Sequence, residues 1–520
     1  MPVALDPVFY LIGDEVSTAR PVTLDSKWKI EDVKRAVGAA FHVAAPLGLT
    51  FHLGENEQEL FSVGEILSAS FSQTTSIGLR IDGQAVQNPQ GPEDLPLVGS
   101  FYEIFPDHLG NHYRLFRKYG HVIKTTNMGK TTYLTDSPQV TAVALTESVY
   151  MTKKINENHP LWGVKDNTAI FIGDTETENW RLAHKFLPPA MGPKAVRHYT
   201  PLMQECHMVK LASQTIGKFS LGTDFEHFTD VDAPLHPIVT NIANLLSLNK
   251  KITARGEWYR HLPFGDPARL KLVQRTIYSL LQEKIDLARG SGIDGIPMNQ
   301  AAVEASCVVD YLLNTVDESG EKFPEGLIVA NMLIVTGAGF ITTSALMSWL
   351  LHCLVTYEGA QDRLYEELCE RGVANTDKPV DWTTRRLHNA SFQPRRTTKT
   401  EVVLPGGYRL PPDSVIVPNL YSIHTNPEVW RDLFRFDPDR WTSEESKNKH
   451  RCAYIPFATG PRGCIGFNFA LLEVKILLSE LVSRHESTRE GLEAIEYDPE
   501  FQLIRPLNFY VRAKKRTTTV

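Results

Sequence analysis

The chain has 520 residues, of which 42% are hydrophobic and 22% charged, with a formal net charge of −7 at pH 7. This length predicts more than one domain, or a large domain with a smaller one. The acidic balance argues against a nucleic-acid partner, which would require a basic face. Six scattered cysteines without a C-x-x-C pair argue against a disulfide framework and favour a reducing compartment.

The first segment has the pattern of a small α+β unit. The stretches VFYLIGDEV, RPVTLD, LTFHLG and IGLRIDGQAV have strand character, and IEDVKRAVGAAFHV has the spacing of an amphipathic helix. We expect a β-grasp-like unit over residues 1–88, without a recognisable catalytic constellation. The Pro- and Gly-rich stretch QNPQGPEDLPLVGS then predicts a boundary, with a second domain over residues 89–520.

Helical periodicity dominates the second domain. Helices are expected at 107–119, 176–189, 196–216, 269–289, 302–315, 325–356 and 358–371, with short strands near 400–418 and 501–513. The N-terminus has no basic region and only a short apolar run, so neither a signal peptide nor an anchor is expected there.

A possible membrane span lies at residues 326–357, which contain no Asp, Glu, Lys or Arg. Acidic flanks and the polar notch TGAGFITTS favour a buried helix at the centre of a globular domain instead. No transmembrane anchor is therefore expected. The default location is cytoplasmic, and peripheral membrane association stays open.

A glycine-rich stretch, AYIPFATGPRGCIGFNFALLEVK, surrounds Cys464 at residues 453–475. Glycines let the backbone turn tightly and approach a flat or bulky group. Phe469, Leu472 and Ile476 recur at helical spacing, so Cys464 lies near a helix N-terminus, where a thiolate is favoured. A buried structural cysteine is the plain alternative. Zinc would require more thiols or histidines at close spacing.

Four stretches together resemble the cytochrome P-450 superfamily of haem-thiolate monooxygenases. FATGPRGCIG matches F-x-x-G-x-R-x-C-x-G, and AGFITT, ENWRLAHKF and FDPDRW occur in the order typical of that family. The resemblance runs from about residue 90 to the C-terminus and implies a mainly α fold with small β-sheets. WRLAH is most similar to the soluble, fatty-acid-hydroxylase-like branch, and no fused reductase is expected.

The resemblance implies haem b, iron protoporphyrin IX, with the thiolate of Cys464 as the axial iron ligand. Phe457 would pack against the thiolate side of the haem, and Gly466 would belong to the same cofactor loop. The distal groove would consist of Ala338, Gly339 and Thr342, where a threonine hydroxyl can relay a proton to dioxygen.

Basic and aromatic side chains would hold the haem propionates. The resemblance assigns this role to Arg462, Trp180, His184 and Arg396. Trp180 and His184 share a helix face, and a core pair is the alternative for them. For Arg395 and Arg396, a solvated basic pair is the alternative.

Two departures from the family pattern stand out. The residue before Thr342 is Ile341, where the family usually has an acid. Either water relays the proton to dioxygen in place of the acid, or the consumption of electrons is uncoupled from product formation, or the chemistry needs no proton relay. The residue three before Arg386 is Thr383, so the family's Glu-x-x-Arg lacks its Glu.

The buried network that Arg386 and Arg440 would form therefore has no carboxylate. Part of the Glu-x-x-Arg helix near 372–386 is also missing. Either the gene model omits a segment or the protein is degenerate.

The implied function is insertion of one oxygen atom from O2 into an apolar small molecule. The reaction would be secondary-metabolite tailoring or fatty-acid-like hydroxylation, with electrons from NADPH through a separate reductase. Two alternatives stay open: a haem-binding pseudoenzyme, and a haem-thiolate isomerase or dehydratase that needs no reductant.

Overall fold

The structure is a computed structural model. It describes residues 6–54, 58–70, 76–105, 107–159, 169–198, 208–230, 232–289, 295–370, 388, 393–491, 494–497 and 504–516. The chain forms two compact units. Unit 1 comprises residues 1–159, 393–423 and 450–453, and unit 2 comprises 160–392, 424–449 and 454–520.

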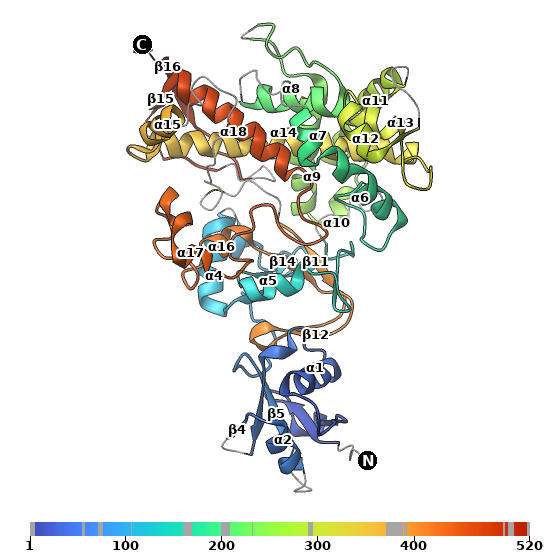
Figure 1. Ribbon diagram of the computed structural model, residues 1–520, viewed down its shortest axis with the longest axis vertical. Coiled ribbons are helices and arrows are strands. Elements are labelled where there is room, and N and C mark those ends of the chain that lie inside the picture. Colours follow the sequence, from blue (N-terminus) through green and yellow to red (C-terminus); the bar gives the residue numbers. More distant parts are fainter. Residues whose placement is uncertain are drawn as a thin grey trace. The chain divides into compact units, whose positions relative to one another are not determined.

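The N-terminal part of unit 1 is a β-grasp fold (Figure 1). Its elements are β1 (Val8–Leu11), β2 (Arg20–Pro21), α1 (Ile30–Ala40), β3 (Leu49–Leu53), β4 (Gln58–Leu60), α2 (Val63–Ser70) and β5 (Ile77–Ile81). The sheet order is β2-β1-β5-β3-β4, with β1 parallel to β5 and the other pairs antiparallel. Alternate strand residues such as Phe9, Phe51 and Leu79 are buried in one core with Val33 and Val37 of α1, which fixes the strand register.

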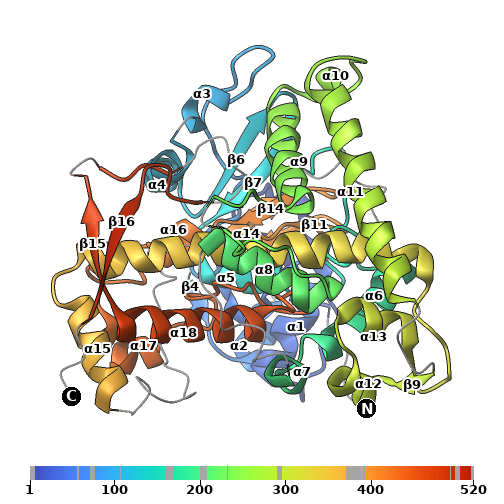
Figure 2. The ribbon, with the colours of Figure 1, turned by 90° about the horizontal axis from the view of Figure 1, so that it is seen from above.

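A second sheet of unit 1 has the order β6-β7-β14-β11-β8 (Figure 2). The strands are β6 (Val122–Asn127), β7 (Lys130–Thr135), β8 (Met151–Thr152), β11 (Arg396–Thr398) and β14 (Val415–Pro418). The accompanying helices are α3 (Phe101–Ile104), α4 (His108–Tyr119), α5 (Pro138–Ala144) and α16 (Leu420–His424). The short β11 thus joins segments that are distant in the sequence.

The β-grasp part is fastened to a hairpin of β12 (Val402–Leu404) and β13 (Tyr408–Leu410). Isolated bridges join Val43 to Val403 and Gln87 to Tyr408. Val403 lies in the β-grasp core. Asp14 and Arg409 form a two-point ion pair in which both side chains are about three-quarters buried. This β-grasp part is therefore packed against the hairpin, not merely tethered by a linker.

Unit 2 is mostly helical. Its helices are α6 (Glu178–Ala190), α7 (Pro193–His198), α8 (Met208–Leu221), α9 (Pro237–Ala254), α10 (Glu257–Arg260), α11 (Asp266–Ala288), α12 (Met298–Glu304), α13 (Val308–Asn314), α14 (Glu325–Thr356), α15 (Ala360–Glu370), α17 (Glu444–Lys447) and α18 (Phe467–Arg484). Its short strands are β9 (Ile296–Pro297), β10 (Thr315–Val316), β15 (His485–Glu490) and β16 (Tyr510–Lys515).

The long helix α14 has the bounds that the sequence predicted. Within the described residues it is the helix long and apolar enough to cross a membrane, and 67% of its most apolar stretch is buried inside the structure. It packs along α8, beside which both ribbon views place it (Figures 1 and 2). This burial is that of a core helix.

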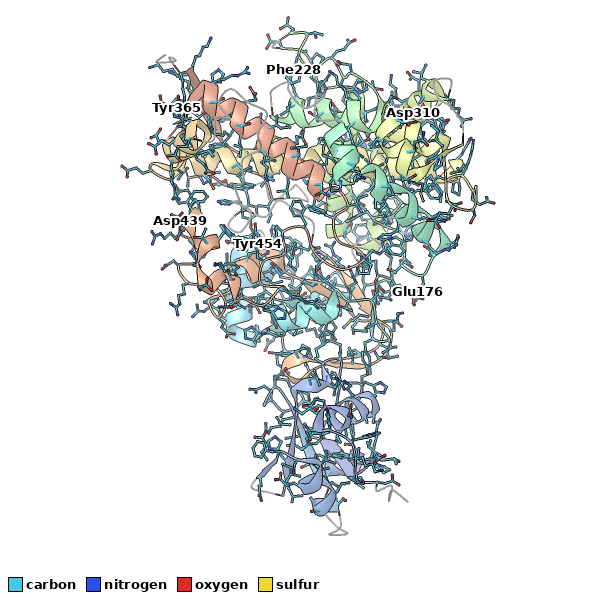
Figure 3. All side chains as sticks on the ribbon, in the orientation of Figure 1. Glu176, Phe228, Asp310, Tyr365, Asp439 and Tyr454 are labelled. Atoms are coloured by element: carbon cyan, nitrogen blue, oxygen red, sulfur yellow. The ribbon has the colours of Figure 1, made fainter. Side chains whose placement is uncertain are left out.

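One predicted helix was wrong: residues 302–315 are split into α12 and α13. Ser306 donates its backbone N–H and its hydroxyl to the carboxylate of Asp310 at 2.8 and 2.9 Å. Cys307 is extended there, with φ −161° and ψ 174° (Asp310 is labelled in Figure 3). Local side-chain bonds of this kind compete with helix continuation.

The strand near 501–513 is β16, which pairs with β15, a strand that was not predicted. The predicted helix 196–216 corresponds to the ends of α7 and α8, and its middle lies outside the described residues.

We expect Gly407→Ala to destabilise unit 1 strongly. Gly407 has φ +78°, and a Cβ there would lie 2.4 Å from the carbonyl oxygen of Ala85. Gly54 is the matched control, because it has φ +73° with nothing within 4 Å of its Cβ position. Left-handed backbone costs about 1–2 kcal/mol in either variant. Denaturant unfolding should show a clearly larger loss for Gly407→Ala, and equal losses would contradict the close packing.

Candidate functional site

The loop before α18 holds Cys464 in a tight turn. The backbone N–H of Cys464 donates to the carbonyl oxygen of Phe457 at 2.9 Å, and that of Gly463 donates to Gly460 at 2.9 Å. Gly460 has φ 79°, which a glycine adopts without strain. Gly466 is the N-cap of α18. The exposed Cys464 thiol thus stands just before a helix N-terminus, a position that favours a thiolate.

Gly466 is confined by its surroundings. A Cβ at this position would lie 3.4 Å from the Met191 side chain and 4.0 Å from the Cys464 sulfur. Phe457 and Phe467 flank the loop, with ring centroids 6.0 Å apart. The predicted loop residues are therefore brought together around the cysteine.

Arg462 connects the same loop to the segment before α6. Its guanidinium donates to the carbonyl oxygens of Ile170 and Gly173 at 2.9 and 2.6 Å, and to the Thr175 hydroxyl at 2.9–3.0 Å. It also lies over the Trp180 ring, 4.2 Å from the centroid, where a cation–π interaction is favourable. Arg462 is therefore held at a fixed place.

Trp180 and His184 lie on one face of α6, as their spacing predicted, with ring centroids 4.6 Å apart. The indole N–H of Trp180 is buried and has no hydrogen-bond partner within the described residues. A buried donor of this kind is costly unless a ligand accepts from it. An indole N–H without an acceptor and the Arg462 cation lie next to each other, and together they can bind a carboxylate. These residues therefore fit a haem propionate.

Ala338, Gly339 and Thr342 interrupt the buried surface of α14, and we call this part of the helix the notch. Ala338 is exposed and Gly339 and Thr342 are half-buried, although most of their helix is buried. The Thr342 hydroxyl donates to the Ala338 carbonyl oxygen at 2.7 Å, which leaves its lone pairs as acceptors. Ile341 is buried, 5% exposed. A Cβ on Gly339 would lie 2.5 Å from Ile216 of α8, so the glycine allows close packing of these helices.

Arg440 lies in the loop between α16 and α17. It donates to the carbonyl oxygens of Arg431 and Asp432 at 2.8 and 3.2 Å, and its buried Nε has no partner within the described residues. Its neighbour Asp439 (Figure 3) pairs instead with Arg363 of α15. Arg386 and Thr383 lie outside the described residues. The Nε–H group of Arg440 thus lacks an acceptor among the described residues, at the place where the family pattern has a carboxylate.

Arg396 is the first residue of β11 in unit 1 and is buried, 2% exposed. Its Nη1 donates to the carbonyl oxygen of Arg395 at 2.8 Å. Lys153 and His159, which sequence reasoning did not single out, are also buried in this unit. The burial of Arg396 argues against the alternative of a solvated basic pair.

Glu473 of α18 is another side chain that sequence reasoning missed. It is 1% exposed, and burial raises the pKa of its carboxyl well above the usual value, although Thr215 of α8 opposes the rise. Burial of this kind favours the neutral form of the carboxyl. No local pattern could reveal it, because its burial arises from helix packing.

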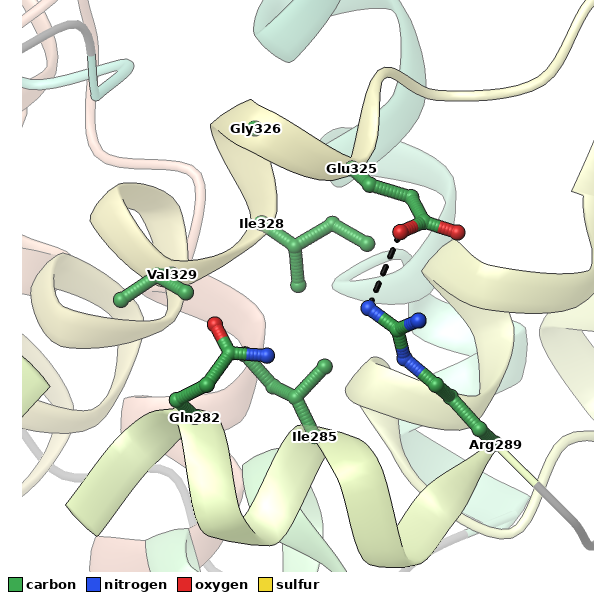
Figure 4. Close-up of a pocket in the computed structure, with 7 residues that line it drawn as sticks. All are labelled: Gln282, Ile285, Arg289, Glu325, Gly326, Ile328 and Val329. Carbon is green, nitrogen blue, oxygen red and sulfur yellow. Dashed lines mark hydrogen bonds and ion pairs between the residues drawn. The ribbon is translucent and has the colours of Figure 1, made fainter. Parts of the chain in front are cut away.

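A separate pocket opens between α11 and α14 (Figure 4). Gln282, Ile285, Ile328 and Val329 line it, and an ion pair of 2.9 Å joins Arg289 to Glu325 at its edge. It contains none of the predicted site residues, and its ion pair is already satisfied. This pocket gives no sign of the chemistry that the cysteine loop indicates.

Comparison with known proteins finds one family model and several similar proteins of the same name. The family model named Cytochrome P450 matches residues 205–507. The chain is 42% identical over 551 residues to the cytochrome P450 monooxygenase alnD of Emericella nidulans, covering 98% of each protein. It is 26% identical over 477 residues to the bifunctional cytochrome P450/NADPH–P450 reductase ascE of Acremonium egyptiacum, covering 82% of this chain and 43% of that protein.

A crystal structure, that of the haem domain of cytochrome P450DA, superimposes with a TM-score of 0.70. The match has 21% sequence identity and covers 83% of this chain and 98% of the other. At this identity the match concerns the fold alone, and it agrees with the mainly α fold with small sheets that the sequence predicted.

We expect Glu473→Gln to stabilise the protein at neutral and higher pH. The pKa of Glu473 is higher in the folded protein than the ordinary value of 4.5, which applies to the unfolded chain. Below pH 4.5 the carboxyl is neutral in both states, so its burial does not lower the stability of the fold. Stability is lost as pH rises from there through the folded pKa. Glu480→Gln, on an exposed ion pair of the same helix, is the control. In denaturant unfolding, the gain for Glu473→Gln should vanish near pH 4.5. A gain that does not depend on pH would contradict this account.

Proposed function

The chain belongs to the cytochrome P450 family of monooxygenases, and we propose that it inserts one oxygen atom from O2 into an apolar small molecule. The observation that carries this proposal is the loop in which Cys464 precedes α18 and Arg462 lies over Trp180. The reaction would be the tailoring of a secondary metabolite, which is compatible with the similarity to the fungal monooxygenase alnD over the whole chain. Fatty-acid-like hydroxylation is the other option, and NADPH would supply electrons through a separate reductase.

Each residue near the cysteine has a distinct task in this proposal. Cys464 would supply the thiolate that holds haem b, and this group would supply the activation of dioxygen when it is bound. Phe457 would shield the sulfur from water. Arg462 and the unpaired indole N–H of Trp180 would hold a propionate, with His184 beside them.

The notch on α14 would serve the oxygen side. Ala338 is exposed and carries only a methyl group, Gly339 lets α8 pack close to the helix, and Thr342 offers a hydroxyl that is fixed by its bond to Ala338. Ile341 is buried and cannot carry a proton, so a water held by Thr342 would have to deliver it. Where no water delivers the proton, turnover would be uncoupled, unless the chemistry needs no such relay.

A second candidate function is a haem-binding protein that does not turn over. Two observations favour it: Ile341 stands where the family usually has an acid, and the Nε of Arg440 has no acceptor in the described part of the chain. A haem-thiolate isomerase or dehydratase would also need no acid before Thr342. NADPH consumption with an added reductase distinguishes the monooxygenase from both alternatives, and rearrangement of a substrate without reductant identifies the isomerase.

We also propose that a segment is missing from this sequence before Arg386. The alignment with alnD spans 551 residues, more than the 520 of this chain, so the relative has stretches without a counterpart here. The Nε of Arg440 supports the same idea, because it has no acceptor among the residues that the structure describes and a Glu in that segment would accept from it. Uncompensated charge in a buried network costs about 3–5 kcal/mol.

We expect haem to bind the chain with a thiolate ligand. The reduced, carbon-monoxide-bound form should show the red-shifted absorption band of a thiolate-ligated haem, and Cys464→Ala should lose it. Cys369→Ala removes another exposed thiol and should keep the band. Loss of the band in both variants, or its persistence in Cys464→Ala, would contradict the assignment.

We expect a chain completed with the corresponding segment of alnD, inserted between Glu370 and Arg386, to retain haem better than the chain as it stands. The inserted Glu would neutralise Arg386 and Arg440. Haem released to an excess of apomyoglobin measures retention, and equal rates with and without the segment would count against the missing segment.

A further inference from the structure

The β-grasp part has charges of opposite sign at the two edges of its sheet. In the sheet order β2-β1-β5-β3-β4, the strands β2 and β4 form the opposite edges (Figure 1). Residues 20–35, which contain β2 and the start of α1, have five Lys or Arg and three Asp or Glu. Residues 36–79 have no Lys or Arg, and their four Glu all lie within residues 55–65, in or next to β4 and α2. One edge is therefore basic and the other acidic.

The acidic edge consists of Glu59 of β4, Phe61, and Glu65 of α2. A capping box fixes its backbone: the Ser62 N–H donates to the Glu65 carboxylate at 3.3 Å, and the Ser62 hydroxyl accepts from the Glu65 N–H at 3.2 Å. The N–H of Phe61 donates to the same carboxylate at 2.7 Å. The Phe61 ring is nevertheless 71% exposed. A ring on a fixed backbone loses little conformational freedom when a partner covers it.

The basic edge consists of Lys27, Trp28 and Lys29, which follow β2 and precede α1. Both lysines are exposed, and neither has an ion-pair partner in the described part of the chain. The nearby carboxylates of Asp25 and Asp32 accept from the backbone N–H groups of the two lysines at 2.9 and 3.3 Å. Trp28 is 37% exposed. This edge thus presents an indole ring between two ammonium groups.

The two edges complement each other in charge and in apolar surface. The carboxylates of the acidic edge match the ammonium groups of the basic edge, and the Phe61 ring matches the indole of Trp28. We propose that the acidic edge of one copy binds the basic edge of a second copy of this chain, so that the β-grasp parts associate head to tail. Because the two edges are different surfaces, each copy keeps one edge open and the association can continue.

Side chains, rather than a continued sheet, make this contact. The strand β2 has only two residues, and its Pro21 has no N–H to donate to a neighbouring strand. Short edge strands with charged side chains prevent uncontrolled strand pairing. The contact therefore depends on charge and is sensitive to salt. The β-grasp part also lies outside residues 205–507, which match the family model, and the inference does not rest on the function proposed above.

Sedimentation velocity of the full chain over a dilution series measures this association. In about 0.1 M salt, where the Debye length is about 10 Å, the sedimentation coefficient of the wild type should rise with protein concentration. In about 1 M salt the Debye length falls to about 3 Å, and the association should weaken roughly tenfold.

Each edge can be removed separately, because its side chains are exposed. The double variant Glu59→Gln, Phe61→Ser lacks the acidic edge, and the double variant Lys27→Gln, Lys29→Gln lacks the basic edge. Each should stay monomeric alone, whereas an equimolar mixture should form a complex of one copy of each that does not grow further. Glu401→Gln neutralises an exposed carboxylate of unit 1 outside both edges and should associate like the wild type.

Three results would overturn the proposal: a wild type that stays monomeric at low salt, a double variant that associates like the wild type, or a mixture that forms no complex. Equal melting temperatures by circular dichroism show that the variants are folded, so a mixture without a complex counts against the contact. The thiolate band tests the proposed function separately, since none of these residues belongs to the cysteine loop.

Discussion

The candidate site depends on the hydrogen bonds and the ring contact that the guanidinium of Arg462 makes. This group binds two backbone carbonyl oxygens and a hydroxyl in the segment 170–175 and lies over the Trp180 ring. Hydrogen bonds to a charged group contribute about 1.5–3 kcal/mol each. One side chain thus links the cysteine loop, the segment before α6 and α6 itself. Without it, the glycine-rich turn that holds Cys464 would lose its bonds to the segment 170–175.

The turn is braced from its other side by helix packing. Phe469 of α18 lies against Phe219 of α8, with ring centroids 4.5 Å apart. Ile216 of α8 in turn packs against Gly339 of α14. The buried hydroxyls of Ser220 on α8 and Thr336 on α14 bond to each other at 3.0 Å. The cysteine loop and the small residues of α14 are therefore connected through a packed core.

The sequence predicted well those features that are encoded locally. The bounds of α14 follow from an uninterrupted apolar stretch between two acidic residues, and the turn before α18 follows from its glycines. The break between α12 and α13 was not foreseen, because it depends on Ser306 bonding to Asp310. The strand β15 exists only through its pairing with β16, some twenty residues later.

The same limit applies to the site: the residue types around Cys464 could be named, but the exact partners of Arg462 could not. Burial of single charged groups is likewise a product of packing and leaves no mark in the local sequence.

Two kinds of buried ionisable group in this protein illustrate how burial and chemistry interact. Burial raises the pKa of the Glu473 carboxyl, so this group can take up a proton in place of a buried charge. An arginine has no such escape at neutral pH, even where burial has lowered its pKa to about 10. The raised pKa of Glu473 is therefore consistent with a purely structural role. Arg395 and Arg396 keep their charge, and among the described residues some of their N–H groups have no acceptor. These two arginines therefore point to an anion more directly than the carboxyl of α18 does.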